Sequence, residues 1–192
     1  MRTIIEIDEP TSIGISPTDL DDERSYVVTA VGRVATGSVV LGAEQVAVLA
    51  DRMSAMVDEL ERRGLVDIDG RPMEDVGPIP PADTAFHAES MLIGWDEEVD
   101  QLVIEVWSGT ADDGVGDSAH IRGDAAEDEV TDDDPTGPDV VRIHLAPVMA
   151  QHFIRSSLAV LAADRSTCPL CAEPLRSSRH RCRPIEDATR ED

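Results

Sequence analysis

The three cysteines of this 192-residue chain lie close together near its C-terminus, at spacings that are typical of a metal site. Two residues separate Cys168 from Cys171, and a single residue separates His180 from Cys182. Thiolate sulfur and imidazole nitrogen are preferred ligands of zinc, and two cysteines at this spacing can reach one ion from a tight turn. We therefore predict that Cys168, Cys171, His180 and Cys182 hold one tetrahedral Zn²⁺.

Four protein ligands would close the coordination sphere of this zinc, which favours a structural role over a catalytic or redox one. Unmetallated thiols are the other alternative. A disulfide would use two cysteines and leave the third unpaired. The first residues, Met1-Arg-Thr-Ile-Ile-Glu, run into charge without the apolar stretch of a secretory signal. We therefore expect a cytoplasmic protein, in a reducing compartment that disfavours disulfides.

A second group of chemically capable residues is spread over two predicted strands. Glu105 lies in the strand predicted at 102–107, and Arg142 and His144 share one face of the strand predicted at 140–145. If these strands are neighbours, the three side chains gather on the sheet face away from the helices, where they would bind an anion or move protons. The alternative, which we favour, is a set of cross-strand polar pairs on a solvated face.

Net charge narrows the partners that the chain can bind. It carries a formal charge of −24, which opposes binding to nucleic acid and to anionic membranes. The exception is the segment 165–185, which holds five arginines and one acidic residue. These arginines either offset the charge of the zinc thiolates, as we favour, or contact an acidic partner such as RNA. No apolar run reaches the roughly 18 residues of a membrane span.

Hydrophobic periodicity predicts two helices, at 43–63 and 147–163, among several strands. Strands are expected at 4–7, 26–31, 38–41, 85–95, 102–107 and 140–145. The first helix repeats apolar residues at helical spacing, namely Val46, Leu49, Met53, Met56, Val57 and Leu60. The second is expected to bury Ala150, Phe153, Ile154, Ser157, Leu158 and Leu161.

The order of these elements indicates an α+β domain at 1–164, with a mostly antiparallel sheet and two main helices on one face. Residues 109–138 are rich in Gly and Asp and poor in large apolar groups, so we predict a disordered acidic loop there. Residues 165–192 would form a separate arginine-rich tail, with the zinc knuckle as a short C-terminal module.

Several of these segments, taken with the metal motif, resemble domain-of-unknown-function family 3090, a bacterial family of about this length. The resemblance covers most of the chain outside the acidic loop. It implies an α+β fold that ends in a zinc-binding tail, and it supplies no activity. The segments that carry it are Ser38-Val-Val-Leu41, Gln45-Val-Ala-Val-Leu-Ala50, Ser90-Met-Leu-Ile-Gly-Trp-Asp96, Val103-Ile-Glu105, Val141-Arg-Ile-His-Leu145 and the Cys/His motif.

Function follows from these features by elimination. The sequence has no phosphate-binding glycine loop, nucleophile elbow or dinucleotide fingerprint. We therefore expect a non-catalytic binding or adaptor protein with protein partners, in which Trp95 and Trp107 near one hairpin would mark a contact. The alternatives are an enzyme that uses Glu105, Arg142 and His144, and a weak nucleic-acid contact through the C-terminal arginines. Substrate, partner identity and oligomeric state are left open.

Overall fold

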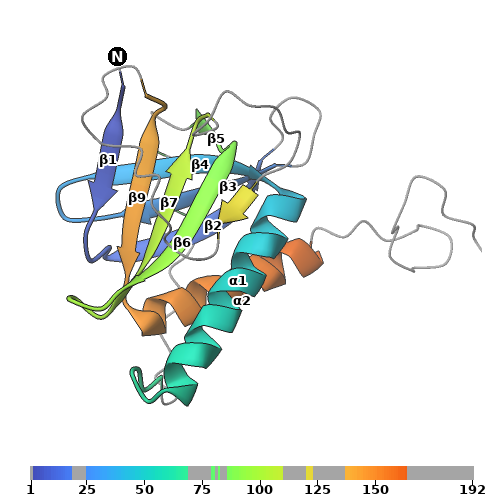
Figure 1. Ribbon diagram of the computed structural model, residues 1–192. Coiled ribbons are helices and arrows are strands. Elements are labelled where there is room, and N and C mark those ends of the chain that lie inside the picture. Colours follow the sequence, from blue (N-terminus) through green and yellow to red (C-terminus); the bar gives the residue numbers. More distant parts are fainter. Residues whose placement is uncertain are drawn as a thin grey trace, which may run out of the picture.

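A computed structural model describes residues 2–18, 25–68, 79–80, 82, 86–109, 120–122 and 137–163 of the chain. Strands and two helices alternate along these segments (Figure 1), which confirms the α+β class. The strands are β1 (Ile4–Ile7), β2 (Ser12–Thr18), β3 (Ser25–Val31), β4 (Thr36–Gly42), β5 (Phe86–His87), β6 (Ser90–Asp96), β7 (Gln101–Trp107), β8 (His120–Arg122) and β9 (Val140–Leu145). The helices are α1 (Ala43–Arg62) and α2 (Pro147–Ala163), within one residue of the predicted bounds.

The strands divide into two sheets, where we had expected one. Sheet A has five strands in the order β1-β9-β7-β6-β8, and sheet B has four in the order β2-β3-β4-β5. The β2–β3, β3–β4, β6–β7 and β7–β9 pairs are antiparallel, in line with the mostly antiparallel arrangement predicted, whereas β1–β9, β4–β5 and β6–β8 are parallel. The parallel partners are distant in sequence, and such pairings leave no hairpin signal in the sequence.

The predicted strand at 85–95 is interrupted because the chain changes sheets within it. The Ala88 N–H donates to the Val40 carbonyl of sheet B at 2.9 Å, and the next amide, of Glu89, donates to the Trp107 carbonyl of sheet A at 3.0 Å. These consecutive bonds to different sheets separate β5 from β6.

Two strands were not predicted. β2 contains Gly14 and Pro17, which are poor strand formers, but it pairs with β3 alone at the edge of sheet B, where proline is tolerated. β8 lies within 109–138, the segment predicted to be a disordered loop. It pairs with β6 at the edge of sheet A, and backbone pairing of this kind needs few apolar side chains.

The two sheets approach each other closely at Gly37 of β4. A Cβ atom at this position would lie 2.9 Å from Cδ1 of Ile7 and 3.0 Å from Cγ1 of Val141, on two strands of sheet A. Both neighbours are buried, so a side chain here would displace packed atoms. Glycine therefore permits the close contact of β4 with β1 and β9.

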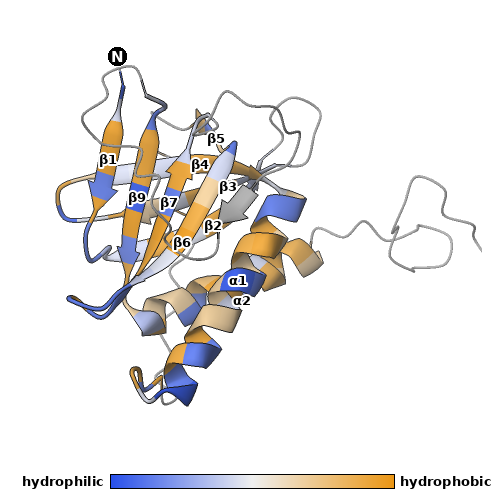
Figure 2. Cartoon of the chain, viewed as in Figure 1, coloured by the Kyte–Doolittle hydropathy of each residue, from blue (hydrophilic) through white to orange (hydrophobic). Residues whose placement is uncertain are grey.

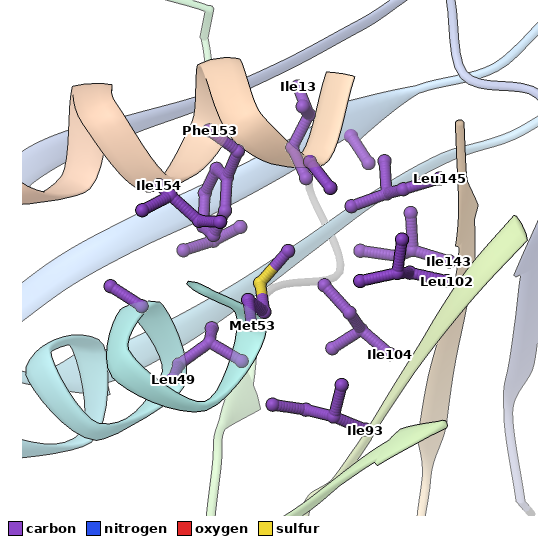
Figure 3. Packing of buried hydrophobic residues seen from close by; sticks show 14 of the residues in the cluster. Ile13, Leu49, Met53, Ile93, Leu102, Ile104, Ile143, Leu145, Phe153 and Ile154 are labelled. Carbon is purple, nitrogen blue, oxygen red and sulfur yellow. The ribbon is translucent and has the colours of Figure 1, made fainter. Parts of the chain in front are cut away.

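The helices pack on each other and against both sheets (Figure 1): α2 contacts β2 of sheet B and β7 of sheet A, and α1 contacts β3 and β4 of sheet B. Figure 3 shows Met53 of α1 among side chains from both helices and both sheets, including Phe153 and Ile104. Both helices thus lie on one side of sheet A, as predicted, and they pack on sheet B as well. Met56 is only partly buried and Leu158 is exposed, although periodicity placed both in the core. The end of α2 is apolar on several sides, so spacing does not define its buried face.

The end of α1 combines a charge pair with a glycine stop. Arg63 donates from Nε to the Glu59 carboxylate one turn earlier, and this hydrogen bond lowers the pKa of Glu59 below its ordinary value. Gly64 follows with a positive φ of 70°, a conformation that ends helices and suits glycine.

The predicted zinc ligands Cys168, Cys171, His180 and Cys182, and the whole tail 165–192, lie outside the described residues. Neither α1 nor α2 combines the length and hydropathy that crossing a bilayer requires.

Candidate functional site

The outer face of sheet A carries a row of charged side chains across three strands. In β7 and β9 the residues that alternate with buried ones face away from the core. Strand register aligns Glu6 of β1 with Arg142 of β9, and Arg142 with Glu105 of β7. Figure 2 shows hydrophilic bands on these adjacent strands, which are otherwise largely hydrophobic.

Arg142 lies between the two carboxylates of this row. Its Nε donates a hydrogen bond to Oε1 of Glu105, and its Nη1 lies 3.8 Å from Oε1 of Glu6. The side chains of Arg142 and Glu105 are only 20% and 18% exposed. Partial burial weakens the screening of the pair by water, so its attraction exceeds that of a fully exposed ion pair. The guanidinium group is therefore held in place by its neighbours.

His144 is the next outward residue along β9, and its ring is 15% exposed. Its Nε2 is buried and has no hydrogen-bond partner within the described part of the chain. The nearest charged atoms are Oε1 of Glu6 at 3.8 Å and Oδ1 of Asp8 at 3.9 Å. These distances are too long for direct hydrogen bonds, and they leave a gap between one nitrogen and two carboxylates.

Glu6 and Asp8 were not singled out from the sequence. They reach the site because β1 pairs with β9 in parallel, which places Ile7 opposite Ile143 and brings the next residue, Asp8, near His144. The available signal was the alternation of apolar and acidic residues from Ile4 to Asp8. That pattern indicates a strand with an acidic face, but it does not identify the neighbouring strand.

The residues predicted on the sheet face are brought together by the structure. Glu105, Arg142 and His144 all lie on the face of sheet A away from the helices. The two tryptophans separate: Trp95 packs against the core, whereas Trp107 lies on the outer face, in register with Val140. The contact predicted from the two tryptophans is therefore reduced to one of them.

Apolar groups border the charged row on both sides. On one side Ile4, Val140 and Trp107 form a register row, and on the other Val103 lies beside His144. Beyond Glu105, the next residue in register is the apolar Leu92 of β6. Figure 1 draws no described helix or strand packed over this face. The outer face is thus a mixed surface, in which a fixed ion-pair row lies among apolar side chains that range from the buried Val140 to the exposed Ile4.

Comparison with known proteins gave a single kind of match. A search of curated proteins and a search of solved structures found no significant match. The model of one family, described as a protein of unknown function (DUF3090), matches residues 7–182. This range includes most of the described fold and the Cys/His motif. The chain therefore belongs to the DUF3090 family.

Proposed function

We propose that the protein is a non-catalytic binding protein, and that the outer face of sheet A is the surface that contacts a partner protein. The main support for this proposal is the position of Arg142, whose guanidinium group lies between the carboxylates of Glu6 and Glu105. Beside this row, Trp107 and Leu92 are partly exposed. Arginine and tryptophan are enriched where proteins bind one another.

The same observation counts against the catalytic alternative. An anion-binding or acid/base site around Glu105, Arg142 and His144 would need the guanidinium group to face a substrate. Two acidic neighbours instead neutralise it, and a substrate anion would have to displace a partly buried carboxylate. The arrangement therefore favours a preformed contact surface over a reaction centre.

The charge of the surface indicates the chemistry of the partner. Glu6, Asp8 and Glu105 bring three negative charges to the site against the positive charge of Arg142. The whole chain is strongly acidic as well, so association with a basic protein surface is favoured. A partner with a complementary arginine- or lysine-rich patch fits this face.

The C-terminal tail adds a second element to the proposal. In it, Cys168, Cys171, His180 and Cys182 hold a structural Zn²⁺ that makes the tail a rigid contact module. The support is the ligand chemistry of the motif, since three thiolates and one imidazole suit tetrahedral zinc. The fold of α1 and α2 does not depend on this module, because their buried residues pack on each other and on the sheets.

The contact surface is tested by affinity capture from the native cytosol with two matched variants. Leu92→Arg places a charge on the outer face, whereas Val34→Arg places the same charge at a fully exposed position of the β3–β4 hairpin. We expect Leu92→Arg to lose partners that the wild type and Val34→Arg both retain. If all three proteins retain the same partners, the outer face is not the contact surface.

The zinc module is tested by metal substitution in the full chain. Cobalt bound by thiolates gives a sulfur-to-metal absorption band, which reports this site alone. We expect the band in the wild type and in Ser177→Ala, and its loss in Cys168→Ser and Cys182→Ser. Absence of the band from wild-type protein prepared under reducing conditions would refute the zinc assignment.

A further inference from the structure

A different observation on the same sheet edge points to a ligand. The Nε2 of His144 is buried without a hydrogen-bond partner among the described residues, and two carboxylates face it. We infer that Glu6, Asp8 and His144 form a binding site for a divalent transition-metal ion at the β1–β9 edge of sheet A. The inference does not rest on the proposed function, because a metal ion can bind here whether or not a protein partner exists.

The distances between the three ligand atoms suit one shared ion. Metal bonds to imidazole nitrogen and carboxylate oxygen are about 2.0–2.2 Å long, so two ligands of one ion lie at most about 4.2 Å apart. The Nε2 of His144 lies 3.8 Å from Oε1 of Glu6 and 3.9 Å from Oδ1 of Asp8. All three ligand atoms lie within 4.8 Å of one another. A small rotation of the carboxylates therefore completes the site.

The three ligands differ in how far they are buried, and therefore in how freely they can move toward an ion. His144 is held in the sheet, so its unpartnered Nε2 is a metal-ligating atom at a fixed position. The side chains of Glu6 and Asp8 are 51% and 73% exposed, so they can adjust to an ion at little cost. Arg142 lies 3.8 Å from the same Glu6 oxygen and restricts how far that carboxylate turns. Groups that hold a ligand in this way commonly tune metal affinity.

The donor set selects the class of metal. One imidazole and two carboxylates suit first-row transition ions such as Mn²⁺ and Zn²⁺, whereas Ca²⁺ and Mg²⁺ prefer all-oxygen sites. The Cys/His motif of the tail has soft thiolates and prefers Zn²⁺. Mn²⁺ therefore probes the sheet site while the tail keeps its zinc.

The test uses the full chain, supplied with Zn²⁺ in no more than an equimolar amount so that the thiolates of the tail take it up, and then titrated with substoichiometric Mn²⁺. Histidine ring signals are followed by NMR. Paramagnetic Mn²⁺ broadens the signals of the ring that it binds. We expect the His144 signals to disappear at lower Mn²⁺ than those of His87 on β5 and His152 on α2. This comparison is needed because a chain of charge −24 attracts cations diffusely.

Two charge-matched variants complete the test, with free Mn²⁺ measured by electron paramagnetic resonance. Asp8→Asn removes a ligand, and we expect it to weaken Mn²⁺ binding at least about tenfold. Glu9→Gln removes the same charge from the adjacent exposed residue and should leave the affinity unchanged. Equal weakening by the two variants, or equal broadening of all three histidines, would show diffuse attraction only and overturn the inference.

Discussion

Truncation of Met53 tests the packing that places the helices on sheet A. Met53 is 0% exposed and lies where both helices meet both sheets (Figure 3). Met53→Ala removes three buried heavy atoms, each comparable to a methylene group of about 0.8 kcal/mol, or about 2.4 kcal/mol together. The remaining cavity raises the expected loss in the free energy of unfolding to roughly 3–4 kcal/mol. Helix propensity changes little, because methionine and alanine both favour helices.

Met56 provides the matched control, because it lies three residues further along α1 and is only partly buried. Met56→Ala makes the same chemical change with less buried surface, so we expect a loss below about 1.5 kcal/mol. Urea unfolding followed by tryptophan fluorescence measures both losses, since Trp95 packs against the core. Met53→Ala should also lower the melting temperature by roughly 10 °C. Equal losses for the two variants would show that α1 is rotated differently about its axis.

Three further results are expected. Gly37→Val forces a side chain between the two sheets and should lower the free energy of unfolding by about 1–3 kcal/mol. Gly94→Ala should lower it less, because the nearest side-chain atom to the new Cβ would be 3.9 Å away. Equal denaturation midpoints for the two variants would contradict the close contact of the sheets. A double-mutant cycle of Arg142→Met and Glu105→Gln should give a coupling free energy of about 1–2 kcal/mol for folding, which is more than an exposed ion pair gives. A value near zero would show that the two side chains do not stabilise each other. Because the pKa of Glu59 is lowered in the folded protein, its contribution is present above about pH 4.3 and is lost on acidification, so the stability gap between wild type and Glu59→Gln should close at low pH. A gap that does not narrow as the pH falls through the acidic range would refute this.

The elements that follow local rules were predicted correctly from the sequence. Pro147 suits the first turn of a helix, and α2 begins there. Gly64 follows the last arginines of α1 and ends it. The strands at 4–7 and 140–145 have the predicted bounds, because alternation of apolar and polar residues is itself a local property. The Cys/His motif is equally local, and its zinc stays a prediction because it lies outside the described residues.

Partners distant in the chain were decided by the tertiary structure. Periodicity identifies the buried face of a strand, but many strands have such a face, and so it does not identify a neighbour. The separation into two sheets depends on backbone bonds at Ala88 and Glu89 that point to different partners. These bonds satisfy backbone groups in both sheets, and nothing in the local sequence records which strand accepts them.

The candidate site shows the same division. Alternation alone placed Arg142 and His144 on one face of a strand, and Glu105 on the outward face of another. Only the parallel pairing of β1 with β9, across more than a hundred residues, brought Glu6 and Asp8 to the free nitrogen of His144. The sequence thus determined which side chains are available for chemistry. The packing of strands that are distant in the sequence decided which of these side chains share a site, because residues throughout the core contribute to the free energy of that packing.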